Sequence, residues 1–355
     1  MLPLLPLVPD VEAILCASPK SVHVEKMVGA VDGVQFVECL PFHLWRRRDA
    51  ILERDLGRFA PDVIFIPMER YYRYQNVPTV NQLLNMFPMV RSQSYHVVEK
   101  LRNITKRISA RRALSRADRV IAVSRFVQEH LIRDLAISTE RIGLVYPGAE
   151  ASLCKSPARP TTIPEEWGTG FHFTAGSIDP YRGLEDLLGA LAVLRSRGMR
   201  CRCAIAGSHR PIMKGYAAHL QRMAREWNLA PDICWTGQLA WEEMSWCYQC
   251  CSAFIMTSRV EASPNIALEA MSHGCLIISA QNPPLPEFFG AGAIFYRPFE
   301  KESLAGAIAT TQQMRESERD SLRKRAMEES GRFSWRSTAE KTVLELKKAV
   351  EMARQ

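Results

Sequence analysis

The sequence predicts an α/β protein made of two doubly wound domains, in which parallel strands alternate with helices. Apolar runs of strand length, such as residues 63–66 and 253–256, recur between segments with the periodicity of amphipathic helices. The chain has 355 residues, of which 47% are hydrophobic, so it is long enough to bury two cores. Residues 151–168 are rich in proline and show little periodicity, which predicts a linker between the domains.

The N-terminal domain is predicted to span residues 1–150. Its run at 63–66 is continuously apolar, which is typical of a parallel strand covered on both faces. Ser124 is expected to cap a helix that turns Val127 and Leu131 inward. The other elements expected in this half are a helix at 49–59 and strands at 11–16, 34–37, 77–88, 117–123 and 144–146.

The C-terminal domain is predicted to span residues 169–331 and to repeat the alternation. Its expected strands are at 171–175, 203–206, 233–235, 253–256 and 276–278, and its expected helices are at 184–195, 221–228 and 242–250. Ligands of open α/β sheets bind beyond the carboxyl ends of the strands. The loops that follow these strands are therefore the expected place of a functional site.

One of these loops opens a short helix with a pattern suited to binding phosphate. Ser263 has the hydroxyl of a helix N-cap and Pro264 suits the first helical position, while Gly274 suits the end of the helix. Such a start would direct the N–H groups of Asn265 and Ile266, and the positive end of the helix dipole, at a bound group. The segment therefore predicts a diphosphate site.

Two glutamates flank this helix start, with seven residues between them. Glu261 would repel a phosphate, so its natural partners are hydroxyl groups, which donate to a carboxylate. Glu269 is expected about 8 Å further along the helix axis, at roughly 1.5 Å per residue. Carboxylates at these two depths suit a nucleotide-sugar, with Glu261 at the sugar and Glu269 at the ribose. The alternative is a pair of exposed glutamates without a function.

The wider motif E-x-S-P-N-x-x-L-E-A-M-x-x-G resembles the E-x7-E signature of the family 4 retaining glycosyltransferases, which have the GT-B fold. The segments ADRVIAVSRFVQEHLI and ERIGLVYPGAE are similar to the last third of the family's N-terminal domain. The resemblance extends from about residue 61 to 340. It implies two Rossmann-like domains that face each other across a cleft, with a closing helix at 332–355 that joins the N-terminal domain.

The resemblance also implies roles for individual residues. The loop at 176–183 is similar to the family's donor-phosphate loop, so Arg182 is expected to hold the leaving diphosphate, with Gly176 and Ser177 beside it. Glu261 and Arg182 are the expected catalytic residues. Asn85 lies in the region where the family often has a sugar-facing histidine, and it is expected either to bind a sugar hydroxyl or to be a plain turn residue.

The implied reaction is transfer of a sugar from a nucleotide-sugar to a glycan or lipid-linked acceptor, with retention at the anomeric carbon. Family enzymes are thought to let the departing phosphate take the acceptor's proton, so no metal, other cofactor or histidine base is expected. A glycoside hydrolase is disfavoured, because both carboxylates lie beside a phosphate site.

Besides the missing histidine, the chain departs from the family pattern in two further places. Ser177 stands where the family usually has an arginine, so one of two phosphate clamps is absent or comes from elsewhere. No glycine-rich turn opens the chain, and residues 11–16 correspond to the family's second strand. The expectation is therefore either a start that lies late in the family pattern, without the first strand, or a reduced acceptor side. These departures favour the remaining alternative, a non-catalytic nucleotide-binding protein of the same fold.

The net charge of +8 is concentrated in one segment, in which a set of cations surrounds a single acid, Asp118. These cations are Lys100, Arg102, Lys106, Arg107, Arg111, Arg112, Arg116 and Arg119. The segment could meet anionic lipid or nucleic acid, or be a solvated helix face. No nucleic-acid motif accompanies it and no apolar stripe lies opposite the charges. Peripheral contact with an anionic membrane is therefore the expectation, and no nucleic-acid partner is expected.

Composition also bears on the compartment. No apolar run reaches the 18 or so residues that cross a bilayer. The ten cysteines show no regular spacing, which indicates free thiols in a reducing cytoplasm. A single CxxC, Cys247 to Cys250, is a weak indication of zinc. We expect a cytoplasmic protein that contacts the inner membrane face and binds no metal.

Overall fold

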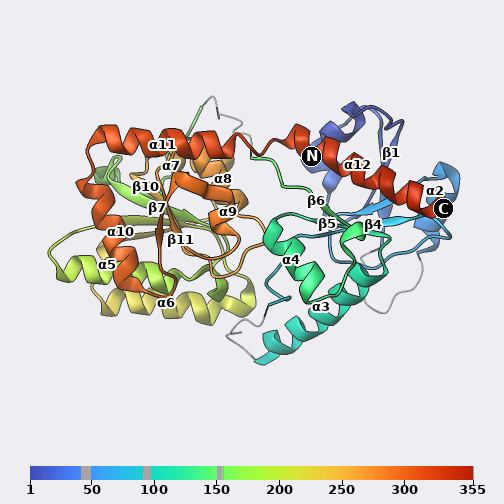
Figure 1. The fold of residues 1–355 in the computed structure, drawn as a ribbon. Helices are drawn as coiled ribbons and strands as arrows, with labels where there is room; N and C mark the ends of the chain where they lie inside the picture. Colours follow the sequence, from blue (N-terminus) through green and yellow to red (C-terminus); the bar gives the residue numbers. More distant parts are fainter. Residues whose placement is uncertain (41–48, 91–96, 150–153, 155, 355) are drawn as a thin grey trace. The chain divides into compact units, whose positions relative to one another are not determined.

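The computed structural model describes residues 1–40, 49–90, 97–149, 154 and 156–354. The chain forms two compact units (Figure 1). Unit 1 comprises Met1–Met89, Leu101–Gly148 and Ser334–Gln355, and unit 2 comprises Val90–Lys100 and Ala149–Phe333. Each unit contains parallel strands connected by helices, so the predicted α/β class is confirmed. Within the predicted linker, residues 151–153 and 155 lie outside the described residues.

Unit 2 is built around a six-stranded parallel sheet with the order β12-β11-β10-β7-β8-β9. Its strands are β7 (Phe171–Ala175), β8 (Arg202–Ala206), β9 (Ile233–Gly237), β10 (Ala253–Met256), β11 (Ile277–Ala280) and β12 (Ala293–Tyr296). Almost every residue of β7, β8, β10 and β11 is buried, because helices cover both faces of the sheet. The strands predicted for this half of the chain are therefore present within one or two residues.

The helices of unit 2 connect these strands as right-handed crossovers require. They are α5 (Leu184–Ser196), α6 (Lys214–Glu226), α7 (Trp241–Cys250), α8 (Asn265–Ser272), α9 (Leu285–Phe289), α10 (Lys301–Gln313) and α11 (Glu316–Ser330). The core between them and the sheet includes Phe173, Tyr248 and Phe254, whose rings pack edge to face or tilted at 5.6–5.9 Å. Close packing at this point fixes the strand ends that carry the loops described below.

The strand order places a switch point between β7 and β10. The chain winds outward from β7 through β8 to β9, then returns to the other side of β7 and continues through β10 to β12. The loops that leave β7 and β10 consequently run in opposite directions from neighbouring strands. A crevice forms at such a point in open α/β sheets, and ligands bind there.

Unit 1 contains a four-stranded parallel sheet with the order β3-β4-β5-β6 and a separate parallel pair, β1-β2. The strands are β1 (Ile14–Pro19), β2 (Val34–Cys39), β3 (Ile64–Ile66), β4 (Thr79–Leu83), β5 (Arg119–Ala122) and β6 (Ile142–Leu144). Three predicted strands have other bounds. The strand expected at 77–88 is β4, which ends at Leu83. The strand expected at 11–16 begins at Ile14, where pairing with Val34 starts, and the strand expected at 144–146 begins at Ile142, opposite Val120.

The helices of unit 1 are α1 (Val24–Val28), α2 (Ala50–Phe59), α3 (Val97–Arg116), α4 (Arg125–Arg133) and α12 (Trp335–Arg354). Asp49 caps α2 by accepting from the N–H groups of Ile51 and Leu52. Ser124 caps α4 by accepting from the N–H of Val127 at 3.2 Å, as its position predicted. Among the helices of the described residues, none is long and apolar enough to span a membrane.

The last helix, α12, packs on unit 1 through a buried ion pair. Glu345 of α12 accepts from Arg119 of β5 at 2.9 Å from Nε, and both side chains are less than one tenth exposed. Position 143 needs glycine, because a Cβ there would lie 2.3 Å from the Glu345 carboxyl carbon. Arg119 therefore does not belong to the surface cations, contrary to the prediction, because its guanidinium is used to hold α12.

Candidate active site

The loop after β7 and the loop after β8 approach each other so closely that both need glycine. Gly176 has a φ of +138° and Gly207 has a φ of +131°, values that side chains rarely allow. A Cβ on Gly207 would lie 1.8 Å from the Gly176 carbonyl oxygen. The Gly176 N–H donates to Ala206 at 3.0 Å. The loop from Gly176 to Gly183 is thereby fixed at the carboxyl edge of the sheet.

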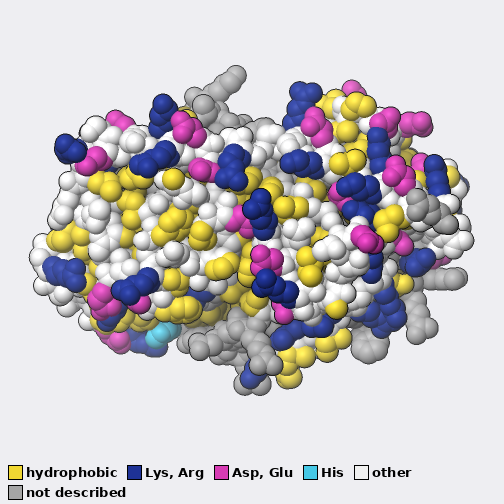
Figure 2. Space-filling model, in the orientation of Figure 1, with side chains coloured by type: hydrophobic (Ala, Val, Ile, Leu, Met, Phe, Trp, Pro, Cys, Tyr) yellow, Lys and Arg dark blue, Asp and Glu magenta, His cyan; other side chains and the backbone are white. Residues whose placement is uncertain are grey.

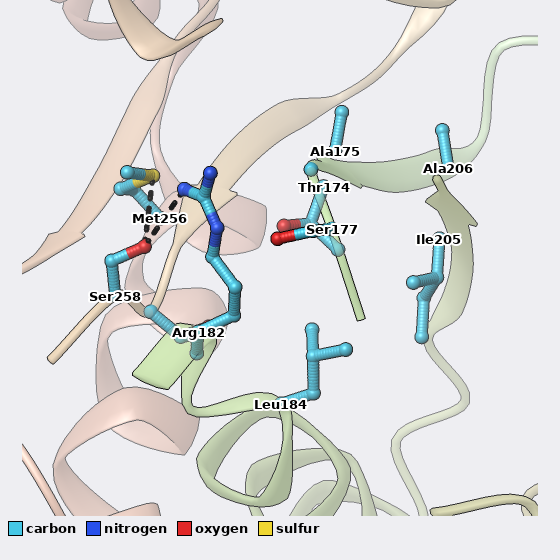
Figure 3. A pocket seen from close by; sticks show the side chains of 11 residues that line it. Thr174, Ala175, Ser177, Arg182, Leu184, Ile205, Ala206, Met256 and Ser258 are labelled. Atoms are coloured by element: carbon cyan, nitrogen blue, oxygen red, sulfur yellow. Dashed lines mark hydrogen bonds between the residues drawn. The ribbon is translucent and has the colours of Figure 1, made fainter. Parts of the chain in front are cut away.

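Arg182 connects this loop with the loop after β10 (Figure 3). Its Nη1 donates to Glu261 Oε1 at 2.5 Å and to Ser258 Oγ at 3.2 Å. The side chains of Arg182 and Glu261 are only 17% and 12% exposed. Thr257 adds a second connection by donating from its hydroxyl to the Arg182 carbonyl at 2.6 Å. The two residues predicted to be catalytic are therefore in direct contact.

The guanidinium of Arg182 borders a small hollow at the switch point. The hollow has a free volume of about 10 Å³ and is lined by Thr174, Ala175, Gly176, Ser177, Arg182, Leu184, Ile205, Ala206, Met256, Thr257 and Ser258. The predicted loop residues Gly176 and Ser177 thus lie beside Arg182. The Ser177 hydroxyl lies 2.9 Å from the Tyr181 hydroxyl. Arg182 is the one cation in this lining, so the hollow itself does not supply the second phosphate clamp.

The helix start differs in detail from the prediction. Pro264, not Ser263, is the N-cap of α8, with a φ of −88° and a ψ of 60°, and its carbonyl accepts from Ala267 at 2.9 Å. The Ser263 hydroxyl donates to Asn265 Oδ1 at 2.7 Å and so does not cap the helix. Among the described residues, no acceptor pairs with the N–H of Asn265 or Ile266. The predicted donors are present although the predicted cap is wrong.

Glycine ends this helix as predicted. Gly274 has a φ of +76°, and its N–H donates to the carbonyl of Met271 at 2.9 Å, while Cys275 donates to Ala270 at 3.0 Å. These bonds satisfy carbonyl groups of the last turn. The helix is therefore only eight residues long, and Glu269 lies in its middle.

Glu269 is the second glutamate of the motif, and it is partly buried against α7. Its Oε2 accepts from the Tyr248 hydroxyl at 3.2 Å. Burial raises the pKa of the Glu269 carboxyl above its ordinary value, and the Tyr248 hydrogen bond and nearby His273 oppose that shift. One oxygen of the carboxylate is thus fixed by Tyr248, which leaves the other for an external donor.

The pKa of Glu261 is likewise set by burial on one side and by its polar partners on the other. Burial raises the pKa of the Glu261 carboxyl, while the Arg182 cation and the Ser258 hydroxyl lower it by a smaller amount. Arg182 itself keeps one polar atom, Nε, buried without a hydrogen-bond partner among the described residues. A buried donor of this kind usually finds an acceptor, which a bound anion would provide.

Asn85 lies in unit 1, at the carboxyl end of β4. Its Oδ1 accepts from the N–H of Phe87 at 3.0 Å, and its own N–H donates to Glu69 at 2.9 Å. These contacts agree with the alternative of a turn residue. Its predicted contact with a sugar stays a prediction.

Several residues of the site were missed in the sequence. Ser258 holds Arg182 and Tyr248 holds Glu269, while Asp179 forms an ion pair with Arg210 at 2.5 Å within the phosphate loop. Arg210 also pairs with the buried Glu99 at 2.6 Å. Ser258 could have been found, because it directly follows a strand at the carboxyl edge. Tyr248 and Arg210 have no local signal, because only the fold brings them to the site.

The cysteine-rich end of α7 was considered for zinc. All ten cysteines are free, and Cys251 and Cys275 bring their sulfur atoms to 3.9 Å. The described residues contain no group of three or more His, Cys, Asp or Glu side chains that could hold a metal ion. Burial raises the pKa of the Cys247 thiol, as expected of a side chain used for packing. The predicted independence from metal stays a prediction.

Comparison with known proteins identifies two families along the chain. Residues 166–329 match the model of "Glycosyl transferases group 1", and residues 11–153 match that of "Glycosyltransferase Family 4". The serotype-specific mannosyltransferase WbdA of Escherichia coli is 21% identical over 317 residues, which are 83% of this chain. The chain spans only 38% of the length of WbdA.

Solved structures of other proteins share the fold. HepE from Anabaena, in complex with UDP and glucose, superimposes with a TM-score of 0.67 at 19% identity over 88% of this chain and 85% of that one. WaaG, described as a glycosyltransferase involved in lipopolysaccharide biosynthesis, gives a TM-score of 0.68 at 12% identity over 94% and 99%. With one glycosyltransferase model matching residues 11–153 and the other matching residues 166–329, this chain belongs to the group 1 glycosyltransferases.

Proposed function

We propose that this protein transfers a sugar from a nucleotide-sugar to a glycan or lipid-linked acceptor, with retention at the anomeric carbon. The observation that carries the proposal is the bond of Arg182 to Glu261 in the loop that leads into α8, at the switch point of unit 2. Arg182 comes from the loop after β7, and the unpaired N–H groups of Asn265 and Ile266 follow the loop after β10. Both suit a diphosphate leaving group.

The donor would use the two glutamates in different ways. Arg182 would exchange or share its bond to Glu261 with the diphosphate, which would free the Glu261 carboxylate to accept from sugar hydroxyls. Glu269, held on one oxygen by Tyr248, would accept from the ribose with the other. The UDP and glucose in the HepE complex support a nucleotide-sugar as the donor.

Leaving-group stabilisation would supply most of the rate. The bond between the anomeric carbon and the diphosphate oxygen breaks, the acceptor oxygen bonds to the same face of that carbon, and the acceptor's proton passes to the phosphate. Arg182 and the α8 N–H groups hold the negative charge that develops on the diphosphate. This route needs no metal and no separate base.

The relatives support a role in polysaccharide or glycolipid biosynthesis. WbdA is named as a mannosyltransferase and WaaG as an enzyme of lipopolysaccharide biosynthesis, so a mannose-type or glucose-type donor is the first to test. The ten free thiols support action in the cytoplasm.

The test is a thermal-shift panel of nucleotide-sugars that includes GDP-mannose and UDP-glucose, repeated on Glu269→Ala. We expect one donor to raise the melting temperature of the wild-type protein and the variant to lose this shift for every donor. Turnover of that donor with EDTA present, and an α-linked product from an α-linked donor by NMR, would support retention without metal. An inverted product or strict metal dependence would contradict the mechanism.

A non-catalytic nucleotide-binding protein is the second candidate, favoured by the single arginine in the hollow. Calorimetry separates the two. Tight binding of a nucleoside diphosphate without turnover of any donor would favour the second candidate, whereas release of nucleoside diphosphate from a sugar nucleotide favours the transferase. Cleavage of a plain glycoside would indicate a hydrolase instead.

A further inference from the structure

Helix α3 (Val97–Arg116) carries an exposed apolar stripe. Leu101, Ile104 and Ile108 are 61%, 40% and 62% exposed. Their spacing of three and four residues places them on one side of the helix, one above the other. Aliphatic side chains as exposed as these gain nothing in water, and three together on one helix face indicate contact with an apolar partner.

The opposite side of α3 is the one that packs on the protein. Asn103, Ala110, Ala113 and Leu114 are less than one tenth exposed. At about 100° per residue, the centre of this buried face lies about 160° around the helix from the apolar stripe. The stripe therefore belongs to a second apolar surface and is not an extension of the core.

Cations border the stripe on both sides. On the helix surface, Lys100 and Arg111 lie along one edge of the stripe, and Arg112 and Arg116 lie along the other. Among the described residues, the side chains of Lys100 and Arg112, one on each edge, have no ion pair or hydrogen bond. Figure 2 shows hydrophobic side chains beside Lys and Arg at the lower edge of the view, where Figure 1 places α3.

The single acidic residue of α3 does not reduce the positive charge of its exposed surface. Helix α3 contains one acidic residue, Glu99, which is 1% exposed and is neutralised by Arg210 at 2.6 Å. The exposed surface of α3 is thus positive throughout, apart from the apolar stripe. The sequence pattern alone shows no apolar stripe opposite the charges, because the stripe lies between the cations.

We propose that this face of α3 seats on a bilayer surface with anionic headgroups. Leu101, Ile104 and Ile108 enter the boundary between headgroups and acyl chains, and the bordering cations contact lipid phosphates. A nucleic acid would use the cations but offers nothing to an aliphatic stripe, which is why a lipid surface fits better. A transferase bound to the bilayer in this way would be near a lipid-linked acceptor. Its membrane binding can be measured without any sugar transfer.

The experiment is sedimentation of the full chain with two kinds of vesicle, one of phosphatidylcholine alone and one with equal parts of phosphatidylglycerol. We expect binding to the anionic vesicles and much weaker binding to the neutral ones. The double variant Ile104→Ser/Ile108→Ser should bind anionic vesicles about tenfold more weakly, because it removes most of the apolar contact. The double variant Lys100→Gln/Arg112→Gln, which removes one cation from each edge of the stripe, should bind anionic vesicles more weakly and with a smaller salt dependence.

The matched control changes exposed aliphatic residues elsewhere. Leu344→Ser/Met327→Ser alters side chains that are each 50% exposed, on α12 and α11, and should bind like the wild-type protein. Melting temperatures of all variants should stay close together, since each site is exposed. The proposal is overturned if anionic vesicles do not bind, or if the Ile variant binds as well as wild type. Donor-induced thermal shifts should persist in the Ile variant, so failure of membrane binding and failure of the transferase are distinguishable.

Discussion

At the scale of single residues, the contact between Arg182 and Glu261 is the central feature of the site. The two side chains are mostly buried and are 2.5 Å apart, so each neutralises the other in the absence of a ligand. Breaking such a pair leaves an uncompensated charge away from water, which is costly. An anion that takes over Arg182 must therefore offer charge in return, and a diphosphate does so.

Replacing Arg182 should affect the chemical step. We expect Arg182→Ala to lower kcat by about 10²–10³-fold, the usual effect of removing one charge-stabilising donor. Turnover of the best donor measures this, with circular dichroism to confirm folding. Arg297→Ala, which alters an exposed arginine paired with Glu300, should leave kcat unchanged. Activity within a few-fold of wild type in Arg182→Ala would remove this residue from the mechanism.

Glu269 should make stability depend on pH. Its folded pKa is raised by burial above the ordinary value of 4.5, so the unfolded carboxyl ionises first as pH rises. The stability contributed by the protonated form is fully present below that value and is lost as pH rises through the folded pKa. The melting temperature of Glu269→Gln should therefore gain on wild type as pH rises above the ordinary value of 4.5.

Tyr248 supplies the comparison for this titration. The Tyr248 hydroxyl opposes the rise in the pKa of Glu269, so Tyr248→Phe should steepen the loss of melting temperature over the same pH range. A difference between Glu269→Gln and wild type that does not change with pH would mean that burial does not raise the pKa of Glu269.

At the scale of elements, the start of α8 decides whether unit 2 can hold an anion. The helix is short, and its first N–H groups stay unpaired because Ser263 bonds to Asn265 Oδ1 and does not cap the helix. A capped start would occupy at least one of these donors. The arrangement gives up the stability of a cap and keeps two donors for a ligand.

Two substitutions at one position test these donors. Asn265→Pro removes the N–H at the first helical position, where proline is tolerated, and Asn265→Ala removes the side chain but keeps the N–H. We expect the proline variant to bind nucleoside diphosphate about tenfold or more weakly than the alanine variant, the value of one hydrogen bond to a charged group. Calorimetry measures both. Equal affinities would show that this N–H does not contact the ligand.

At the scale of the whole molecule, the chain returns to unit 1 after completing unit 2. Helix α12 follows unit 2 in sequence but packs on the sheet of unit 1, through the buried pair of Glu345 and Arg119 and a bond from Thr338 to the Tyr146 carbonyl at 2.8 Å. Unit 1 is therefore complete only when the end of the chain has been added to it.

Glu345 should be important for the stability of unit 1. Glu345→Ala leaves Arg119 buried without its counter-charge, so we expect a loss of about 3–5 kcal/mol in the free energy of unfolding. Urea unfolding measures this change. Glu340→Ala, on the same helix but 52% exposed and paired with Arg336, should change it by less than about 0.5 kcal/mol. Similar losses in the two variants would mean that the buried pair does not hold α12.

The sequence by itself determined the α/β class, most strands of unit 2, and the motif that contains Glu261, Glu269 and Gly274. These follow from local rules: apolar periodicity sets strands and helices, and glycine alone accepts a positive φ without strain.

Only the tertiary structure decided which side chains meet. The pairing of Arg182 with Glu261, the support of Glu269 by Tyr248 and the burial of Arg119 against Glu345 join residues 21 to 226 positions apart. No local pattern encodes such contacts, since they depend on strand order and helix packing. The same is true of α3, where burial of one face separates the apolar residues of the core from those that face outward.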